Sequence, residues 1–241
     1  MKKIAFLFLV TLSLLASCGP KETRNYLVMG SQLQEYGTTF PQMYAEYIEK
    51  DQRAIVHLDY YTGYSPGWIL EQMDASQPLR DLIVNAEVIT FDWDPGATSA
   101  AEYGFLNNTC GGADNQDCLR ADYQKAKDDW VAMLDKLIAL RGGDTSGMRQ
   151  ILMGSWPMAV HYPDVSQEQM SIMLDYFQEM SLFLMEEADK RGIEYVKVFD
   201  GEYFNEKSPP EEWISGVGLT EAGDKVVVDA LKKIEFEKSA K

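Results

Sequence analysis

Short apolar runs alternate with longer amphipathic stretches along the chain. Each run is rich in apolar and often β-branched residues and is followed by loop-forming residues, as is typical of strands. Between them, apolar positions recur at helical spacing. The predicted strands are NYLVMG (25–30), RAIVHLDYY (53–61), EVITFDW (87–93), MRQILMGSW (148–156) and IEYVKVFD (193–200), and the predicted helices span 41–50, 67–84, 121–140, 167–190 and 221–234.

This alternation predicts an α/β fold with a mainly parallel sheet. The size fits one domain, which we place at 25–234 and which a charged tail, 235–241, follows. Ligands of such sheets bind outside the carboxyl ends of the strands. The loops that follow the strands are therefore where a functional site is expected.

The first residues have the features of an export signal. Lys2 and Lys3 precede an apolar run from Ile4 to Ala16, which is too short to span a membrane and ends in LASC. The ending resembles the lipobox of bacterial lipoproteins. The resemblance implies a signal peptide over 1–17, a lipid on Cys18 and a tether over 18–24, and so an exported, extracytoplasmic protein held to a bacterial membrane. The alternative is an ordinary secretory signal with an incidental cysteine.

Two cysteines remain after Cys18, and in an exported protein an even pair favours a disulfide. A bond between Cys110 and Cys118 would close the loop CGGADNQDC. A metal or redox site would need tighter spacing and further ligands. No metal and no cofactor are predicted.

The formal charge narrows the set of partners. It is −16 for the whole chain and becomes −18 when Lys2 and Lys3 leave with the signal peptide. Such a balance argues against nucleic acid as a partner and against electrostatic attraction to anionic lipid.

The loops after the predicted strands resemble those of the SGNH, or GDSL-type, hydrolase family of esterases and lipases. The similarity extends from YLVMGSQLQEYG through VITFDWDPGA and CGGADNQDC to SGVGLTEAGDKVVVDAL. It implies a three-layer α/β/α sandwich with a mainly parallel, flavodoxin-like five-stranded sheet. It also implies four blocks: G-D-S-[LI] with a serine nucleophile, a glycine, G-x-N-D, and D-G-x-H-x-T-x-x-G.

The chain keeps the small residues of these blocks but not the reactive ones. In the first block Gly30 is kept, while Ser31 stands at the aspartate and Gln32 at the nucleophile. In the last block Ser215 stands at the aspartate and Gly218 at the histidine. The last block also keeps Gly216, Thr220 and Gly223. In the second block, the glycine is matched by Gly63 or Tyr64, and Asp59 stands at the start of the block. In the third block, Gly96 or Asp94 stands at the oxyanion-hole residue.

These replacements predict a loss of serine-hydrolase chemistry. A serine hydroxyl is a weak nucleophile without a base, glutamine cannot replace it, and glycine cannot accept a proton. A substitute set would need His161, after the fourth strand, with Ser155, Ser65 or a shifted Ser31. His57 is expected to be a partly buried residue of the second strand.

Aromatic loops suggest what a cleft without this chemistry would do. QEYGTTFPQMYAEY and DYYTGYSPGW follow or end the first two strands, and loop tyrosines suit stacking on a ligand. Asp59, Asp92 and Asp94 raise the alternative of a calcium site or a general acid/base pair. The interpretation that we prefer is that they are solvated loop carboxylates. The candidate lining is Ser31, Tyr36, Asp59, Tyr61, Gly63, Tyr64, Trp93, Asp94 and His161.

The last loop is expected to be well held although its reactive side chain is absent. Thr220 is a predicted N-cap of the final helix. Our hypothesis is a membrane-anchored SGNH-like domain that is catalytically degenerate and binds an acylated or carbohydrate ligand, or an envelope protein. The alternatives are an active serine esterase with a rearranged catalytic set and a purely structural envelope lipoprotein.

Overall fold

The computed structural model describes residues 21–30, 39–63, 65–92, 99–153, 165–198, 214–215 and 218–234. Five strands form one parallel sheet in the order β2-β1-β3-β4-β5. Their bounds are β1 Thr23–Gly30, β2 Ile55–Thr62, β3 Val88–Asp92, β4 Met148–Met153 and β5 Glu194–Val198. The predicted parallel α/β fold and its five strands are confirmed.

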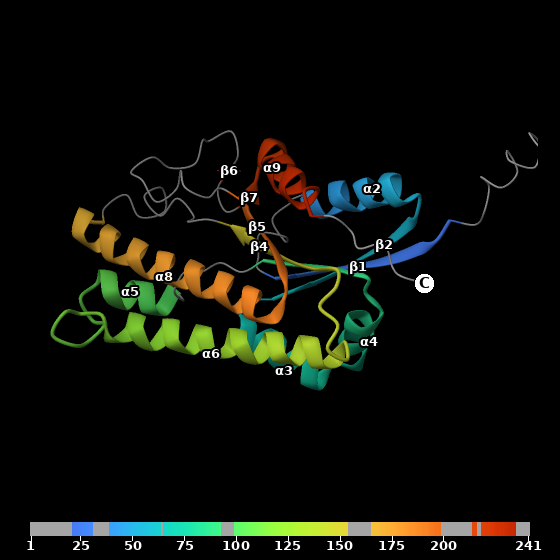
Figure 1. The fold of residues 1–241 in the computed structure, drawn as a ribbon. Coiled ribbons are helices and arrows are strands. Elements are labelled where there is room, and N and C mark those ends of the chain that lie inside the picture. The colour runs from blue at the N-terminus through green and yellow to red at the C-terminus, as the bar shows by residue number, and fades with distance from the viewer. Residues whose placement is uncertain are drawn as a thin grey trace, which may run out of the picture.

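Helices cover both faces of the sheet (Figure 1). On one face lie α2 (Phe40–Gln52) and α9 (Glu221–Leu231). The other face carries α3 (Pro66–Ala75), α4 (Gln77–Asn85), α5 (Ser99–Leu106), α6 (Asp117–Leu140) and α8 (Gln167–Arg191). A two-stranded hairpin, β6 (Ile214–Ser215) with β7 (Gly218–Leu219), precedes α9. The three layers of the expected sandwich are therefore present.

Strand alternation sends side chains into two separate cores. Leu27 and Met29 of β1 face the α6 side, while Tyr26 and Val28 face α2 and α9. All five residues of β3 are buried, as expected of a central parallel strand with helices on both faces. The larger core lies between the sheet and the helices α3, α4, α5, α6 and α8.

The helix predicted over 67–84 is two helices. Ser76 ends α3 and accepts a hydrogen bond from the Leu79 N–H as the N-cap of α4, with Pro78 in its first turn. Proline fits a first turn but not a helix interior. Arg80 donates to the carbonyls of Met73 and Asp74 and so holds the corner between the two helices.

Two expectations about β2 were wrong. His57 is exposed rather than partly buried, because β2 is the outer strand of the sheet. Asp59, a candidate for the cleft lining, does not lie at the end of the strand, which continues to Thr62. It is exposed and opposite Leu27 in the middle of β2, so its carboxyl group lies away from the strand end where the cleft is expected.

Candidate functional site

The first three strands of the sheet end side by side. Gly30 of β1 is in register with Thr62 of β2 on one side and Asp92 of β3 on the other. Beyond β2 the Gly63 N–H donates to the Gly30 carbonyl at 3.0 Å. The loops that carry the first three family-like blocks therefore start from one edge, as the parallel sheet predicts.

Gly30 and Asp92 are packed too closely for any side chain at position 30. A Cβ there would lie 2.3 Å from both the carbonyl oxygen and the Oδ1 of Asp92, and Gly30 has φ +135°. Asp92 is only 1% exposed. A glycine is therefore required directly before Ser31, which explains why this position of the first block is kept.

Gly63 is required for a different reason. A Cβ on it would lie 2.2 Å from the ring of Trp68 in α3. Tyr61 stacks on the same ring at 5.8 Å between centroids and donates its hydroxyl hydrogen to Gln72 at 3.3 Å. Burial raises the pKa of Tyr61. Position 63 therefore has no room for a side chain, and Tyr61 is half-buried against α3.

The hairpin before α9 brings together the two positions that the resemblance equates with aspartate and histidine. Ser215 of β6 is the cross-strand partner of Gly218 in β7, and Ile214 pairs with Leu219. Directly opposite residues of an antiparallel pair have Cβ positions about 4.5–5.5 Å apart. An acid and a base at 215 and 218 would therefore be neighbours, but the chain has serine and glycine there.

Helix α9 holds this hairpin as the sequence predicted. The Thr220 hydroxyl accepts a hydrogen bond from the Gly223 N–H at 3.2 Å, so Thr220 is the N-cap. Leu219, Val227, Val228 and Leu231 are buried in the core with α2.

A contact that the sequence did not indicate joins the loop after β1 to α9. Asp224, 2% exposed, accepts hydrogen bonds from both the N–H and the hydroxyl of Thr39, each at 2.8 Å. Thr39 is the N-cap of α2, and its hydroxyl points to Asp224 instead of capping the helix. The last residue before α2 is thus fixed to the helix that follows the hairpin.

Most of the predicted cleft lies outside the described residues. This holds for Ser31, Gln32, Tyr36, Tyr64, Trp93, Asp94, Gly96 and His161, and also for Cys18 and Ser155. Ser65, a suggested partner of a substitute base, is described: its hydroxyl accepts from the Trp68 N–H at 3.1 Å as the N-cap of α3.

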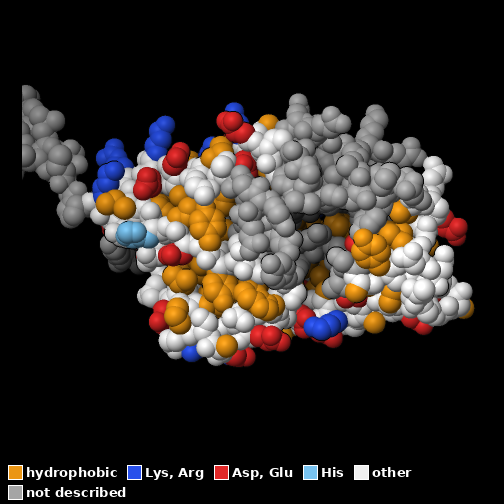
Figure 2. Space-filling model, turned by 180° about the vertical axis from the view of Figure 1, so that it is seen from behind, with side chains coloured by type: hydrophobic (Ala, Val, Ile, Leu, Met, Phe, Trp, Pro, Cys, Tyr) orange, Lys and Arg blue, Asp and Glu red, His pale blue; other side chains and the backbone are white. Residues whose placement is uncertain are grey.

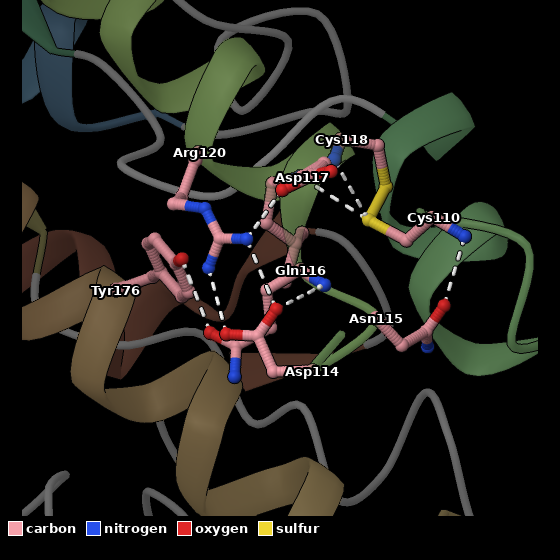
Figure 3. Close-up of polar contacts among 9 residues, drawn as sticks. Cys110, Asp114, Asn115, Gln116, Asp117, Cys118, Arg120 and Tyr176 are labelled. Atoms are coloured by element: carbon pink, nitrogen blue, oxygen red, sulfur yellow. Dashed lines mark hydrogen bonds and ion pairs between the residues drawn. A yellow bond between two sulfur atoms is a disulfide. The ribbon is translucent and has the colours of Figure 1, made fainter. Parts of the chain in front are cut away.

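The predicted disulfide is present where the chain passes from α5 to α6. Cys110 is bonded to Cys118, with Cα atoms 4.8 Å apart. Asn115 braces the loop, since it accepts from the Cys110 N–H at 2.9 Å and donates to the Phe105 carbonyl at 2.7 Å. Figure 3 shows this loop against α6.

Arg120 organises the outer side of the same loop. Its guanidinium contacts Asp114 at 2.8 Å and also Asp117 (Figure 3). Hydrogen bonds from Arg120 lower the pKa of Asp114. Tyr176 reaches across from α8 and donates to Gln116 at 3.2 Å. The loop is therefore fixed by a covalent bond, an asparagine brace and ion pairs.

A groove of about 510 Å³ lies between α6 and α8 next to this loop. Tyr123 and Tyr176 stack on each other within it at 4.9 Å, and Lys127 pairs with Glu179. Arg120, which also lines the groove, pairs with Asp114 and Asp117 of the neighbouring loop. The groove is built on helices, not on the strand ends.

Within the described ranges, no group of histidine, cysteine, aspartate and glutamate side chains is arranged to hold a metal ion. The described helices also include none that is long and apolar enough to cross a membrane.

Solved structures with the same arrangement identify the fold. The lipase Lip_vut3 from a goat rumen metagenome superposes with a TM-score of 0.65 at 15% identity, over 89% of this chain and 99% of that one. A lipase/acylhydrolase from Enterococcus faecalis gives 0.53 at 8% identity, over 90% and 100%. The extracellular lipase from Streptomyces rimosus gives 0.53 at 12%, over 88% and 100%.

The chain has the SGNH hydrolase fold. No protein-family model and no curated protein matches the sequence. At these identities the likeness concerns the SGNH fold alone. Of the predicted site, the structure describes the ends of β1, β2 and β3 and the β6–β7 hairpin.

Proposed function

We propose that this SGNH-fold domain binds a ligand at the carboxyl edge of its sheet without hydrolysing it. The ligand is an acylated or carbohydrate molecule, or another envelope protein, and the domain is held at the membrane by a lipid on Cys18. The observation that carries the proposal is the pairing of Ser215 with Gly218. The hairpin joins the two positions where an acid and a base would act, and neither residue type is present.

The expected loss of hydrolysis follows from the residue types at these positions. Acyl transfer by serine needs a base to remove the hydroxyl proton and an acid to orient that base. Gly218 cannot accept a proton, and Gln32 offers an amide where the nucleophile would be. Nucleophile, base and acid are replaced together, so several substitutions, not one, separate the chain from an active enzyme.

Two features support binding: glycines at the strand ends that leave no room for a side chain, and aromatic residues in the loops that follow. Gly30 and Gly63 occupy positions where any side chain would collide with Asp92 or Trp68. Tyr36, Tyr64 and Trp93 belong to the loops that leave this edge. Aromatic side chains there suit stacking on a sugar ring or an acyl chain.

Binding is tested by titrating candidate glycans and acyl esters while following intrinsic tryptophan fluorescence. We expect a saturable response to one class, reduced by Tyr64→Ala and unchanged by Tyr103→Ala. Tyr103 is 63% exposed on α5 and supplies the matched control. No response across a broad panel of both classes would contradict the binding proposal.

Absence of turnover is tested with a chromogenic acetyl ester and a fluorophosphonate probe. We expect neither hydrolysis nor labelling. The alternative function, an ester hydrolase with a rearranged set, is favoured by the lipase and esterase activities named for the structural neighbours. Covalent labelling of a serine that is lost in His161→Ala would establish this alternative.

Back-substitution tests the equivalence of the positions. We expect Gln32→Ser with Ser215→Asp and Gly218→His to give trace ester hydrolysis. The matched control carries Gln32→Ser and Ser215→Asp alone and lacks the base, so it should stay inactive. A folded triple variant that neither hydrolyses the ester nor takes the probe would refute the assignment.

Anchoring is tested separately by feeding labelled fatty acid to expressing bacteria. Labelled protein is expected in the membrane fraction for the unaltered chain, and Cys18→Ser should abolish the label. Release of an unlabelled chain into the soluble fraction by both forms would instead support an ordinary secretory signal.

A further inference from the structure

The far edge of β2 is open in the described structure. Ile55 and Gly63 donate their N–H groups to Glu22 and Gly30 on the β1 side. The N–H and C=O groups of successive residues point to opposite sides of a strand. The even-numbered residues of β2 therefore point theirs away from β1. For Leu58 and Tyr60, no strand within the described ranges lies on that side.

The side chains along this edge are unusually accessible. Ile55 and Tyr60 are 45% and 40% exposed, and they are two of the five large hydrophobic side chains that are exposed in the described ranges. His57 and Asp59 are exposed between them. Figure 2 shows a histidine at the surface beside apolar side chains, and His57 is the histidine that the described residues contain.

We propose that a second copy of this chain pairs with this edge, β2 against β2, antiparallel about a two-fold axis at Leu58. Leu58 then faces Leu58 of the second copy, and the two residues exchange N–H and C=O hydrogen bonds. The two parallel sheets become one continuous sheet of ten strands. The interface is isologous, as a closed two-fold dimer requires.

This register makes every facing pair complementary. On the α3 side, His57 faces Asp59 and Ile55 faces Tyr61; on the α2 side, Val56 faces Tyr60. An imidazole N–H can donate to the carboxylate opposite it, and aromatic side chains pack well on β-branched ones. Moving the axis by one residue sets Asp59 against Asp59 or His57 against His57, which removes this attraction.

In the single chain, Glu49 of α2 occupies one hydrogen-bonding position of this edge. Its carboxylate accepts the outward N–H of Val56 at 3.0 Å. The bonds between the two Leu58 residues, and those from Tyr60 to the Val56 carbonyl, do not use that N–H. When the dimer forms, the Tyr60 carbonyl of the second copy replaces the Glu49 carboxylate as the acceptor of the Val56 N–H.

Cysteine cross-linking tests the axis directly in the full-length chain carrying Cys18→Ser, whose other two cysteines are joined to each other. Leu58→Cys places two thiols across the axis, where facing Cα atoms about 5.5 Å apart permit a disulfide. Mild oxidation is expected to give a covalent dimer that reductant separates. Ile55→Cys lies on the same strand but faces Tyr61, so it is expected to form no covalent dimer on the same oxidation.

Charge exchange tests the pairing without a covalent bond. His57→Asp sets carboxylates opposite each other and is expected to raise the dimer dissociation constant by about tenfold or more, measured by light scattering or sedimentation. His57→Asp with Asp59→His restores opposite partners and the dimer. A monomeric unaltered chain, equal cross-linking of both cysteine variants, or a double variant as weak as the single one would each overturn the proposal.

Discussion

At the scale of single residues, the site is defined by two glycines and one buried carboxylate. Gly30 allows β1 and β3 to touch where their loops begin, and Gly63 makes room for the Trp68 ring. Asp224 joins the chain before α2 to the helix after the hairpin. These residues determine where the loops start.

We predict that Gly30→Ala destabilises the fold by at least about 3 kcal/mol, because its Cβ would overlap Asp92 in addition to the strain of a positive φ. Gly142→Ala is the matched control, since Gly142 has φ +67° but no atom within 4 Å of the added Cβ, and about 1 kcal/mol is expected. The free energy of unfolding in urea measures both. Equal losses would show that the contact with Asp92 relaxes.

We predict that Asp224→Ala lowers the free energy of unfolding by at least about 2 kcal/mol, because it leaves the N–H and hydroxyl of Thr39 without their acceptor. Asp224→Asn keeps one side-chain acceptor and should lose less. Asp229→Ala, on the exposed side of α9 and paired with Lys232 among the described residues, should change the value by less than about 0.5 kcal/mol. A similar loss for Asp224→Ala and Asp229→Ala would contradict the assigned role.

At the scale of elements, the connections between helices are built from backbone carbonyls and side chains that bind them. Arg141, at the end of α6, donates to the carbonyls of Ala86 at 2.6 Å, Asp144 at 2.9 Å and Ser146 at 2.9 Å. Burial lowers the pKa of Arg141. One guanidinium therefore joins the end of α4 to the turn before β4.

We predict that Arg141→Lys destabilises the protein by about 2–3 kcal/mol, although the charge is kept. An ammonium group cannot reach three separate carbonyls as a planar guanidinium does, and buried acceptors are left unpaired. Arg80→Lys, at the more exposed corner of α3 and α4, is expected to cost less. Thermal unfolding of the two variants distinguishes them, and a larger loss for Arg80→Lys would refute this ranking.

We predict that breaking the disulfide between Cys110 and Cys118 costs about 2–3 kcal/mol, as expected for a closed loop of this size. Reductant should lower the unfolding midpoint of the unaltered chain and should leave that of Cys110→Ala with Cys118→Ala unchanged. Equal midpoints for the oxidised and the double-variant forms would mean that Asn115 and Arg120 hold the loop without the bond.

Patterns local in sequence predicted the elements well, and patterns that depend on strand order did not. The strands, the N-cap Thr220 and the disulfide all follow from neighbouring residues. The break in 67–84 was also encoded: Met73 and Leu79 are six residues apart, so one helix would place them on different faces. The exposure of His57 depends on β2 being outermost, which no local pattern gives.

The candidate site was predictable to a similar extent. Its edge of the sheet was predicted from the alternation of strands and helices. The substituted positions rest on the family resemblance and stay a prediction, although Ser215 and Gly218 are cross-strand partners. The bond between Thr39 and Asp224 spans 185 residues, so neither residue type nor spacing could indicate it. α5 was missed because its eight residues include Gly104 and follow a predicted loop.

At the scale of the whole molecule, a strongly acidic chain folds around two cores separated by one sheet. The formal charge is −16, with 38 acidic and 22 basic residues. Like charges repel one another more in the compact state than in the extended chain. Folding therefore proceeds against a general electrostatic cost that is separate from the local ion pairs.

We predict that raising NaCl from about 0.01 M to about 1 M increases the thermal midpoint, since the screening length falls from about 30 Å to about 3 Å. A variant with Glu46→Gln, Asp51→Asn and Glu186→Gln removes three exposed charges that form no ion pair among the described residues, and should respond less. A midpoint that falls with salt would show that ion pairs outweigh the repulsion.

The packing of α2 against α9 brings the two ends of the domain into one layer (Figure 1). During synthesis Asp224 leaves the ribosome 185 residues after Thr39, which at about 5–20 residues per second is a delay of about 10–40 s. Until then α9 cannot cover its part of this face beside α2. The native layer of α2 and α9 therefore cannot form until residue 224 has been made, and such late completion is compatible with the export that we propose.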